Sequence, residues 1–161
     1  MQYEVQDGSR MLTFEGELLG SVTSQRPSSP RWSEYRLYKT VGGVYVLEKV
    51  GRSIVVHQPG CTKIVEALNR FQTTNPGRDP EDGWWFCESC IFDGRYDLTA
   101  LLVEADRHWV IVSTEADQII DALYRKKSGA RSLPRLSLDL LDQVARVDDR
   151  IGGAFRVERI G

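Results

Sequence analysis

The sequence has almost no net charge and no long hydrophobic run. Its 161 residues include 21 basic and 23 acidic residues, which gives a formal net charge of -2. No whole-molecule field would therefore draw the chain to nucleic acid or to an anionic membrane. No apolar run approaches the ~18 residues of a membrane span, and residues 1–7 lack the basic and apolar regions of a signal peptide. We therefore expect a cytoplasmic protein that does not cross a membrane.

Residues suited to catalysis are also scarce. The chain has two histidines, His57 and His108, and neither stands near a recognisable serine or cysteine nucleophile elbow. Glycine-rich phosphate-binding loops of the Walker or GxGxxG type are absent from the sequence. We assign no catalytic residue and do not favour an enzyme. A small thiol-dependent enzyme would need a pocket that brings Cys61, Cys87 or Cys90 beside a histidine.

Three cysteines make an odd count, which argues against a disulfide framework. Cys87 and Cys90 form a CxxC motif, and two thiolates at this spacing can chelate one tetrahedral zinc ion. His57 and Cys61, which are themselves spaced like a ligand pair, would complete a Cys3His set. A redox-active or oxidised dithiol and plain reduced thiols are the alternatives, because free cysteine also serves as a small core residue. The sequence requires no cofactor, and zinc is the candidate.

Alternating apolar residues predict an antiparallel sheet. The period-2 pattern runs over residues 2–6 and 11–23. The stretch 32–57 then reads as three short strands separated by glycine turns at 42–43 and 51–53. Short loops between neighbouring strands favour a meander.

Helical periodicity predicts about three helices packed on this sheet. Apolar residues recur at helical spacing over residues 62–71, after 114–117, and over 138–147. The glycine pair 152–153 is predicted to stop the last helix, and residues 154–160 to form a final strand. The fold class is therefore α+β.

The whole chain is predicted to form a single α+β domain, with a division into two lobes near 73–83 as the alternative, because breakers and charges gather there. The two halves are similar: residues 46–70 can be laid over residues 102–125. The second half is predicted to contain a hairpin of strands 98–105 and 108–114, followed by a helix. Two ββα units are therefore an option within the same fold class.

Aromatic residues and a basic segment supply the candidate binding surfaces. Large aromatic side chains contribute a disproportionate share of interface energy. The candidates are Trp84, Trp85, Phe86, Trp32, Tyr38, and the basic residues Arg125, Lys126 and Lys127 of the segment 125–131. The plainer interpretations are core packing for the aromatic residues and ordinary surface charge for the basic ones. Nucleic acid is not favoured as a partner, because Glu34 and Glu48 interrupt the basic residues near Trp32.

One part of the sequence resembles a known group. FEGELLG at 14–20 has the form F-x-G-x-x-L-G, and the stretch 32–53 contains YRLYKTVGG, of the form YR-x-Y-x-T-x-x-G. This part resembles the sheet region of small actinobacterial-type proteins such as the EXLDI group, over roughly residues 14–53. The chain lacks that group's ribbon-like amino-terminal segment and its terminal EXLDI signature. The resemblance implies a prokaryotic or mobile-element origin and no activity.

The leading prediction from the sequence is a non-enzymatic protein-interaction or regulatory module of bacterial or mobile-element origin, which binds a protein partner. The alternative is a zinc-stabilised Cys3His module, with nucleic-acid binding as an option. A thiol-dependent enzyme is the third. The distances among His57, Cys61, Cys87 and Cys90 divide these hypotheses, because zinc requires all four side chains at one point.

Overall fold

The structure is a computed structural model of the chain. It describes residues 1–27, 29–61, 85–87, 90, 102–127 and 129–160. The chain divides into two compact units. The first unit comprises Met1–Ser24, Ser33–Val50 and His108–Gly161, and the second comprises Gln25–Trp32 and Gly51–Arg107. The predicted lobe division near 73–83 and the predicted helix over 62–71 lie outside the described residues.

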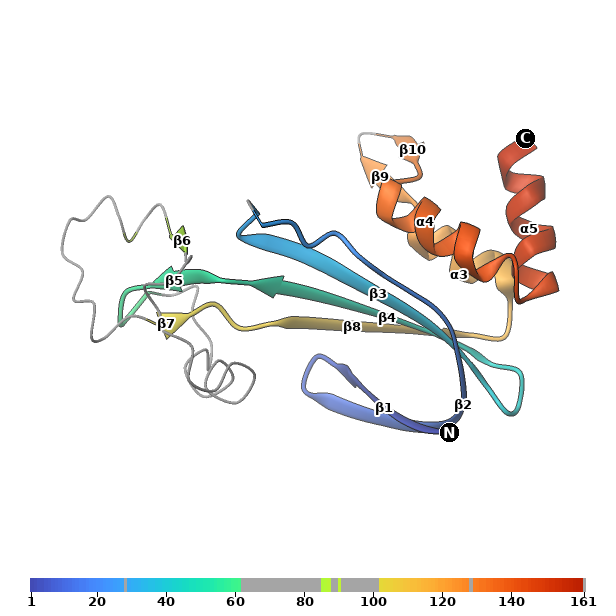
Figure 1. The fold of residues 1–161 in the computed structure, drawn as a ribbon, viewed down its shortest axis with the longest axis horizontal. Coiled ribbons are helices and arrows are strands. Elements are labelled where there is room, and N and C mark those ends of the chain that lie inside the picture. Colours follow the sequence, from blue (N-terminus) through green and yellow to red (C-terminus); the bar gives the residue numbers. More distant parts are fainter. Residues whose placement is uncertain (28, 62–84, 88–89, 91–101, 128, 161) are drawn as a thin grey trace. The chain divides into compact units, whose positions relative to one another are not determined.

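The first unit is built on a curled antiparallel sheet of five strands (Figure 1). Its order is β1-β2-β3-β4-β8. The strands are β1 (Gln2–Asp7), β2 (Arg10–Thr23), β3 (Arg31–Thr40), β4 (Tyr45–Ser53) and β8 (Arg107–Ser113). Gly8 and Gly43 supply the positive φ values, 59° and 86°, that the tight turns after β1 and β3 require. The predicted α+β class and antiparallel sheet are confirmed.

Close contacts, with the backbone of β3 at Gly16 and with side chains of α4 at Gly20, account for two glycines of β2. A Cβ atom on Gly16 would lie 2.2 Å from the carbonyl oxygen of Lys39 on β3. A Cβ atom on Gly20 would lie 2.8 Å from Cγ2 of Val144. The register between β2 and β3 shifts between Leu18 and Gly20, where the strand carries an irregularity. Glycine therefore allows β2 to bend against its neighbours.

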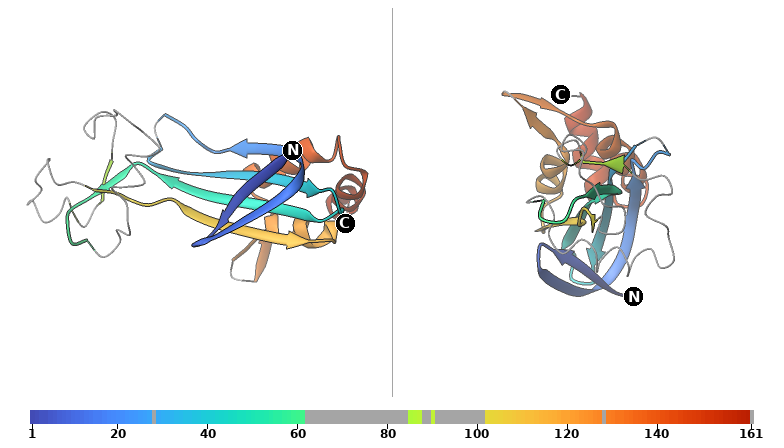
Figure 2. Two further views of the ribbon diagram at one scale, coloured as in Figure 1. Left: turned by 90° about the horizontal axis from the view of Figure 1, so that it is seen from below. Right: turned by 90° about the vertical axis from the view of Figure 1, so that its left-hand side faces the viewer.

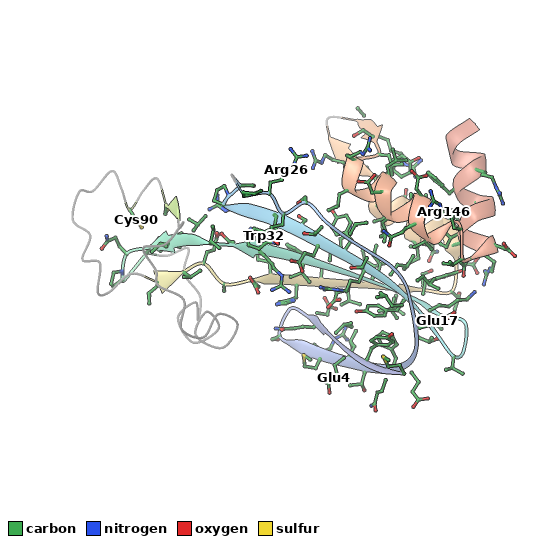
Figure 3. All side chains as sticks on the ribbon, in the orientation of Figure 1. Glu4, Glu17, Arg26, Trp32, Cys90 and Arg146 are labelled. Carbon is green, nitrogen blue, oxygen red and sulfur yellow. The ribbon has the colours of Figure 1, made fainter. Side chains whose placement is uncertain are left out.

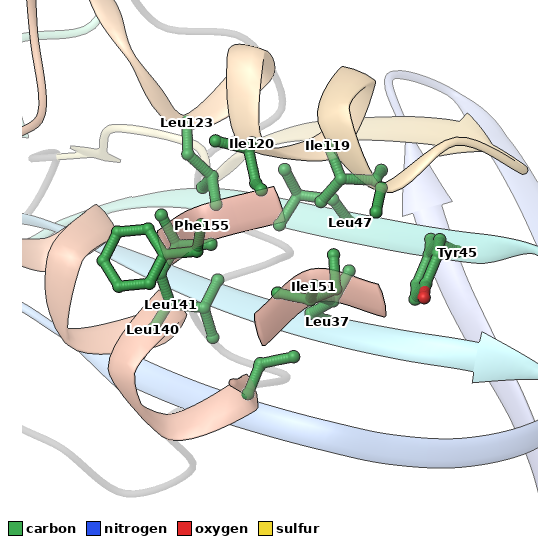
Figure 4. Close-up of a cluster of buried hydrophobic side chains, with 12 residues drawn as sticks. Leu37, Tyr45, Leu47, Ile119, Ile120, Leu123, Leu140, Leu141, Ile151 and Phe155 are labelled. Carbon is green, nitrogen blue, oxygen red and sulfur yellow. The ribbon is translucent and has the colours of Figure 1, made fainter. Parts of the chain in front are cut away.

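Three helices cover one face of this sheet (Figure 1). They are α3 (Ala116–Leu123), α4 (Arg135–Val144) and α5 (Asp149–Ile160). Their apolar stripes meet the sheet in one large buried cluster (Figure 4), which consists of Leu37, Tyr45, Leu47, Ala116, Ile119, Ile120, Leu123, Leu140, Leu141, Val144, Ile151 and Phe155. The predicted helices after 114–117 and near 138–147 are thus present, the second three residues earlier than expected.

The β1–β2 hairpin crosses the other face of the sheet (Figure 2). Val5, Tyr38 and Val46 are buried there, and the rings of Tyr3 and Phe14 pack against Tyr38 with centroids 4.7 and 5.2 Å from it. Tyr38 belongs to this second cluster, so its ring is core and not an exposed binding face.

The turn of the same hairpin reaches β8, the last strand in the sheet order. The Gly8 N–H donates to the His108 carbonyl at 2.9 Å, and the Val110 N–H donates to Asp7 Oδ1 at 3.2 Å. Backbone groups at the edge of β8 are therefore bonded within the chain.

The predicted final strand over 154–160 is wrong, because this segment belongs to helix α5. Ile151 and Phe155 stand four residues apart and both enter the large cluster, which the helical period permits. The glycine pair does not stop the helix. Gly152 instead allows a close approach, since a Cβ atom there would lie 2.9 Å from the Ala145 carbonyl oxygen.

The predicted turn at 51–53 is also wrong, because β4 continues to Ser53. Gly51 makes room for the Arg107 side chain, whose guanidinium nitrogens would lie 3.0 Å from a Cβ atom. The Arg52 guanidinium donates to Asp106 at 2.8 Å and so ties the segment before β8 to β4. Of the predicted hairpin of 98–105 with 108–114, residues 98–101 lie outside the described residues. In the described part, β7 (Leu102–Val103) pairs with β5 and not with β8, and β8 adjoins β4.

The second unit contains a small sheet of three strands in the order β6-β5-β7. Its centre is β5 (Val55–His57), which pairs in parallel with β6 (Trp85–Phe86) and antiparallel with β7. In the described part of the chain, none of the helices has the length and apolar character needed to cross a membrane.

Candidate metal centre

Two of the four predicted ligands come from the end of β5 and the turn that follows it. His57 is the last residue of β5 and is completely buried. The chain then turns through Gly60, whose φ is +83°, and the Cys61 N–H donates to the Gln58 carbonyl at 3.1 Å. This turn returns Cys61 to His57, so that Sγ lies 3.3 Å from Nδ1.

The other two ligands arrive from β6. Parallel pairing aligns Val56 with Phe86, and the next N–H, that of Cys87, donates to the Val56 carbonyl at 2.9 Å. Cys87 is thereby fixed beside the end of β5. Cys90 follows three residues later, and its sulfur accepts the Gln58 N–H at 3.1 Å.

All four side chains converge on one point. One ligand atom from each of His57, Cys61, Cys87 and Cys90 lies within 4.8 Å of the other three. A zinc ion with bonds of about 2.3 Å to sulfur and 2.0 Å to nitrogen would set edges of about 3.5–3.8 Å between its ligands. The cluster is thus within about 1 Å of zinc geometry. The sequence predicted this group, and the structure brings its members close enough to bind a metal ion.

The cluster lies in a largely water-excluded place. Cys87 and Cys90 are 5% and 6% exposed, and with Val55 they form the buried cluster of this unit, against which Cys61 packs (Cys90 is labelled in Figure 3). Burial raises the pKa of the Cys90 thiol, and its neighbours Cys61 and Cys87 raise it further. The N–H that Gln58 donates to this sulfur acts in the opposite sense, because it stabilises the thiolate. A metal that binds here would replace the thiol protons.

A polar network supports β5 on its other side. Glu104 accepts hydrogen bonds from the Ser53 hydroxyl at 2.7 Å and from Arg31 Nε at 3.1 Å. Its own N–H donates to the Val55 carbonyl at 2.8 Å. Burial alone would raise the pKa of Glu104, but the Ser53 and Arg31 contacts hold it below the ordinary value. The carboxylate therefore anchors the strand that presents His57.

Sequence reasoning missed these supporting residues. Gln58 acts through its backbone N–H, which no side-chain pattern reveals. Glu104 is 73 residues from Arg31, so only the folded pairing identifies the network.

The remaining candidate residues do not join the cluster. His108 lies in the first unit, on β8. Trp84 and the side chains of Trp85, Phe86 and Lys127 lie outside the described residues, so their roles stay predictions. Trp32 is half-buried in the second unit, and its role as a binding residue stays a prediction.

The basic segment 125–131 lies in a hairpin. It consists of β9 (Arg125–Lys127) and β10 (Ala130–Ser132), with Gly129 at φ +77° in the turn. Arg125 and Lys126 are exposed. Asp121 forms ion pairs with Lys126 at 3.4 Å and with Arg131 at 2.9 Å, which reduces the positive field of the hairpin.

Comparison with known proteins returns no match to any family model, curated protein or solved structure. The resemblance of residues 14–53 to the EXLDI group therefore stays a prediction.

Proposed function

We propose that this chain is a zinc-stabilised Cys3His module with a non-catalytic binding role. The observation that supports the proposal is the convergence of four ligand atoms within 4.8 Å of one another. Three thiolates and one imidazole form a soft donor set that suits zinc and does not suit magnesium or calcium.

A structural role follows from the number of ligands. Catalytic zinc sites keep one position open for water or substrate, whereas four protein ligands close the tetrahedron. A zinc ion on these four residues would therefore link the end of β5 to the chain that follows β6. Its binding energy would act as folding energy for the second unit. A reducing, cytoplasmic location is part of the proposal, because it keeps the three thiols available.

The binding role is proposed toward a protein. A formal charge of -2 provides no general attraction for nucleic acid. The ion pairs of Asp121 with Lys126 and Arg131 offset part of the positive charge of the basic hairpin.

Metal analysis of purified protein tests the zinc site, with the two histidines as a matched pair. His57→Asn should lose the metal and His108→Asn should retain it, because only His57 lies in the cluster. We expect one zinc ion per chain in the wild type and none in His57→Asn or Cys87→Ser. A wild-type protein that remains metal-free after refolding with zinc would contradict the proposal, as would equal zinc content in the two histidine variants.

A thiol-dependent enzyme is the second candidate, favoured by the 3.3 Å separation between Cys61 Sγ and His57 Nδ1. This distance suits a nucleophile and its base. The convergence of two further thiols on the same point supports metal binding instead. Alkylation by iodoacetamide distinguishes the two: a dyad would give one rapidly modified cysteine whether or not zinc is present, whereas a zinc site would protect all three until a chelator is added.

A further inference from the structure

The four ligands differ in their access to solvent. His57, Cys87 and Cys90 are buried, whereas Cys61 is partly exposed. Oxidants reach and modify accessible thiolates first, and zinc-bound cysteines are thiolates. Cys61 is therefore the ligand that a small oxidant in solution meets first.

The backbone of Cys61 lies in a turn that follows β5, outside the strand pairing. Its N–H bond to Gln58 closes a single turn, in which Gly60 has a positive φ. Cys87, in contrast, continues the pairing of β5 with β6 through its bond to Val56. A change within one turn can move the sulfur of Cys61, whereas moving Cys87 would break strand pairing.

A second thiol stands next to Cys61. The sulfurs of Cys61 and Cys90 lie at most 4.8 Å apart, and Cys90 is fixed beside this turn by the Gln58 N–H that its sulfur accepts at 3.1 Å. A disulfide requires about 2.05 Å between sulfurs. The remaining movement of less than about 3 Å is within the range of a side-chain rotation combined with an adjustment of the turn.

We propose that Cys61 is a peroxide-reactive thiol and Cys90 its resolving partner, so that a hydroperoxide converts the zinc-bound form into a metal-free disulfide form. This inference rests on the proposed zinc site.

The chemistry balances in two steps. The Cys61 thiolate attacks one oxygen of the hydroperoxide, the O–O bond breaks, and Cys61 becomes a sulfenic acid while hydroxide (or alkoxide) leaves. The Cys90 thiolate then attacks the Cys61 sulfur, the S–O bond breaks, and a second hydroxide leaves as the disulfide forms. The two sulfurs supply the two electrons that the peroxide accepts. Zinc keeps only His57 and Cys87 and dissociates, and a thiol reductant reverses the change.

Zinc-loaded protein treated with one equivalent of hydrogen peroxide tests this inference. A chromogenic chelator follows zinc release, and peptide mass spectrometry under non-reducing conditions identifies the disulfide. We expect release of zinc together with a Cys61–Cys90 disulfide, and recovery of zinc binding after dithiothreitol. Retention of zinc under several equivalents of peroxide would overturn the proposal, as would a Cys87–Cys90 disulfide that leaves Cys61 free.

Two matched variants sharpen the result. Cys61→His and Cys87→His each keep four ligands, but only the first removes the accessible thiol. Cys61→His should release zinc at least about tenfold more slowly than the wild type, because buried thiols react slowly, and Cys87→His should still form the Cys61–Cys90 disulfide. Equal release rates in the two variants would refute the assignment of Cys61.

The outcomes separate this inference from the zinc proposal. If the protein bound no zinc, the zinc proposal would fail, and disulfide mapping of the metal-free chain would still decide which pair of cysteines reacts. If the protein bound zinc and retained it after addition of peroxide, only the present inference would fail.

Discussion

The two units bury different kinds of side chain. The first unit has a cluster of twelve buried residues that is almost entirely aliphatic and aromatic. The cluster that the structure describes in the second unit consists of Val55 with Cys87 and Cys90. Apolar burial stabilises roughly in proportion to area, so the first unit has its own driving force for folding. In the described residues, the buried cluster of the second unit holds metal ligands where that of the first has leucine and isoleucine, so we expect a zinc ion to matter to the second unit and not to the first.

Removal of the metal should have the largest effect and should affect one unit only. Structural zinc contributes about 10 kcal/mol or more to small domains that depend on it. After treatment with a chelator, we expect the amides of β5 to lose protection from hydrogen exchange while those around Leu37 and Leu47 keep theirs. Hydrogen-exchange mass spectrometry measures both in one sample. An equal loss of protection in both units would contradict the expectation that the metal stabilises the second unit only.

Truncation of a side chain in the apolar core should destabilise the first unit and leave zinc binding in the second unit unchanged. Leu141→Ala removes a fully buried side chain of α4 and should lower the free energy of unfolding of the first unit by about 2–5 kcal/mol. Zinc content should not change. Leu138→Ala, at a half-buried position of the same helix, is the control and should cost less than half as much. Urea unfolding and metal analysis test both variants, and a loss of zinc in Leu141→Ala would contradict the assignment of the metal to the second unit.

A buried carboxylate makes the stability of the first unit depend on pH. Asp148 accepts bonds from Tyr45 Oη at 2.8 Å, Lys39 Nζ at 2.9 Å and the Ile151 N–H at 2.9 Å. Burial alone would raise the pKa of Asp148, but these three donors lower it below its ordinary value. The stabilisation is therefore complete above the unfolded pKa of about 3.9 and is lost as the pH falls through the lower folded value.

Asp148→Asn should therefore destabilise the first unit by about 1.5–3 kcal/mol at neutral pH, since the hydrogen bonds lose their charge. The difference from wild type should shrink below about pH 4. Asp149→Asn, at the exposed next position, is the control. Urea unfolding at a series of pH values checks this, and a difference that stays constant from pH 7 to pH 3 would refute the role of the ionised carboxylate.

The glycine pair of α5 should show the smallest effects, with opposite signs. Apart from its chain neighbours and the nearby backbone of α5, no described atom lies within 4 Å of a Cβ built on Gly153, so Gly153→Ala should stabilise the helix by about 0.5–1 kcal/mol. Gly152→Ala should destabilise, because the new methyl would meet the Ala145 carbonyl oxygen at 2.9 Å. Thermal unfolding compares the two. Stabilisation by both would show that α5 packs less closely against α4 than described.

The sequence predicted the elements that depend on short spacing. The strands of the first hairpin and the Cys3His group could be recognised because alternating side chains and ligand pairs act over two to four residues. Segment 154–160 was misread because Phe155 and Val157 also fit an alternating pattern, and the contact of Gly152 with Ala145 is invisible in the sequence. The pairing of β8 with β4 joins residues far apart in the chain, as does the bond between Arg52 and Asp106, which are 54 residues apart. Such pairing follows from the assembled fold and not from local pattern.

The turn between β1 and β2 affects how readily a strand from another molecule can add to β8. Asp7 and Gly8 are bonded to Val110 and His108 at the margin of β8, where a strand from another molecule could otherwise add. A tethered segment competes with free chains at an effective concentration of about millimolar. A foreign strand would therefore have to be present at a comparable concentration before it could displace the turn. The hairpin turn thus covers part of the margin of β8 against strand addition.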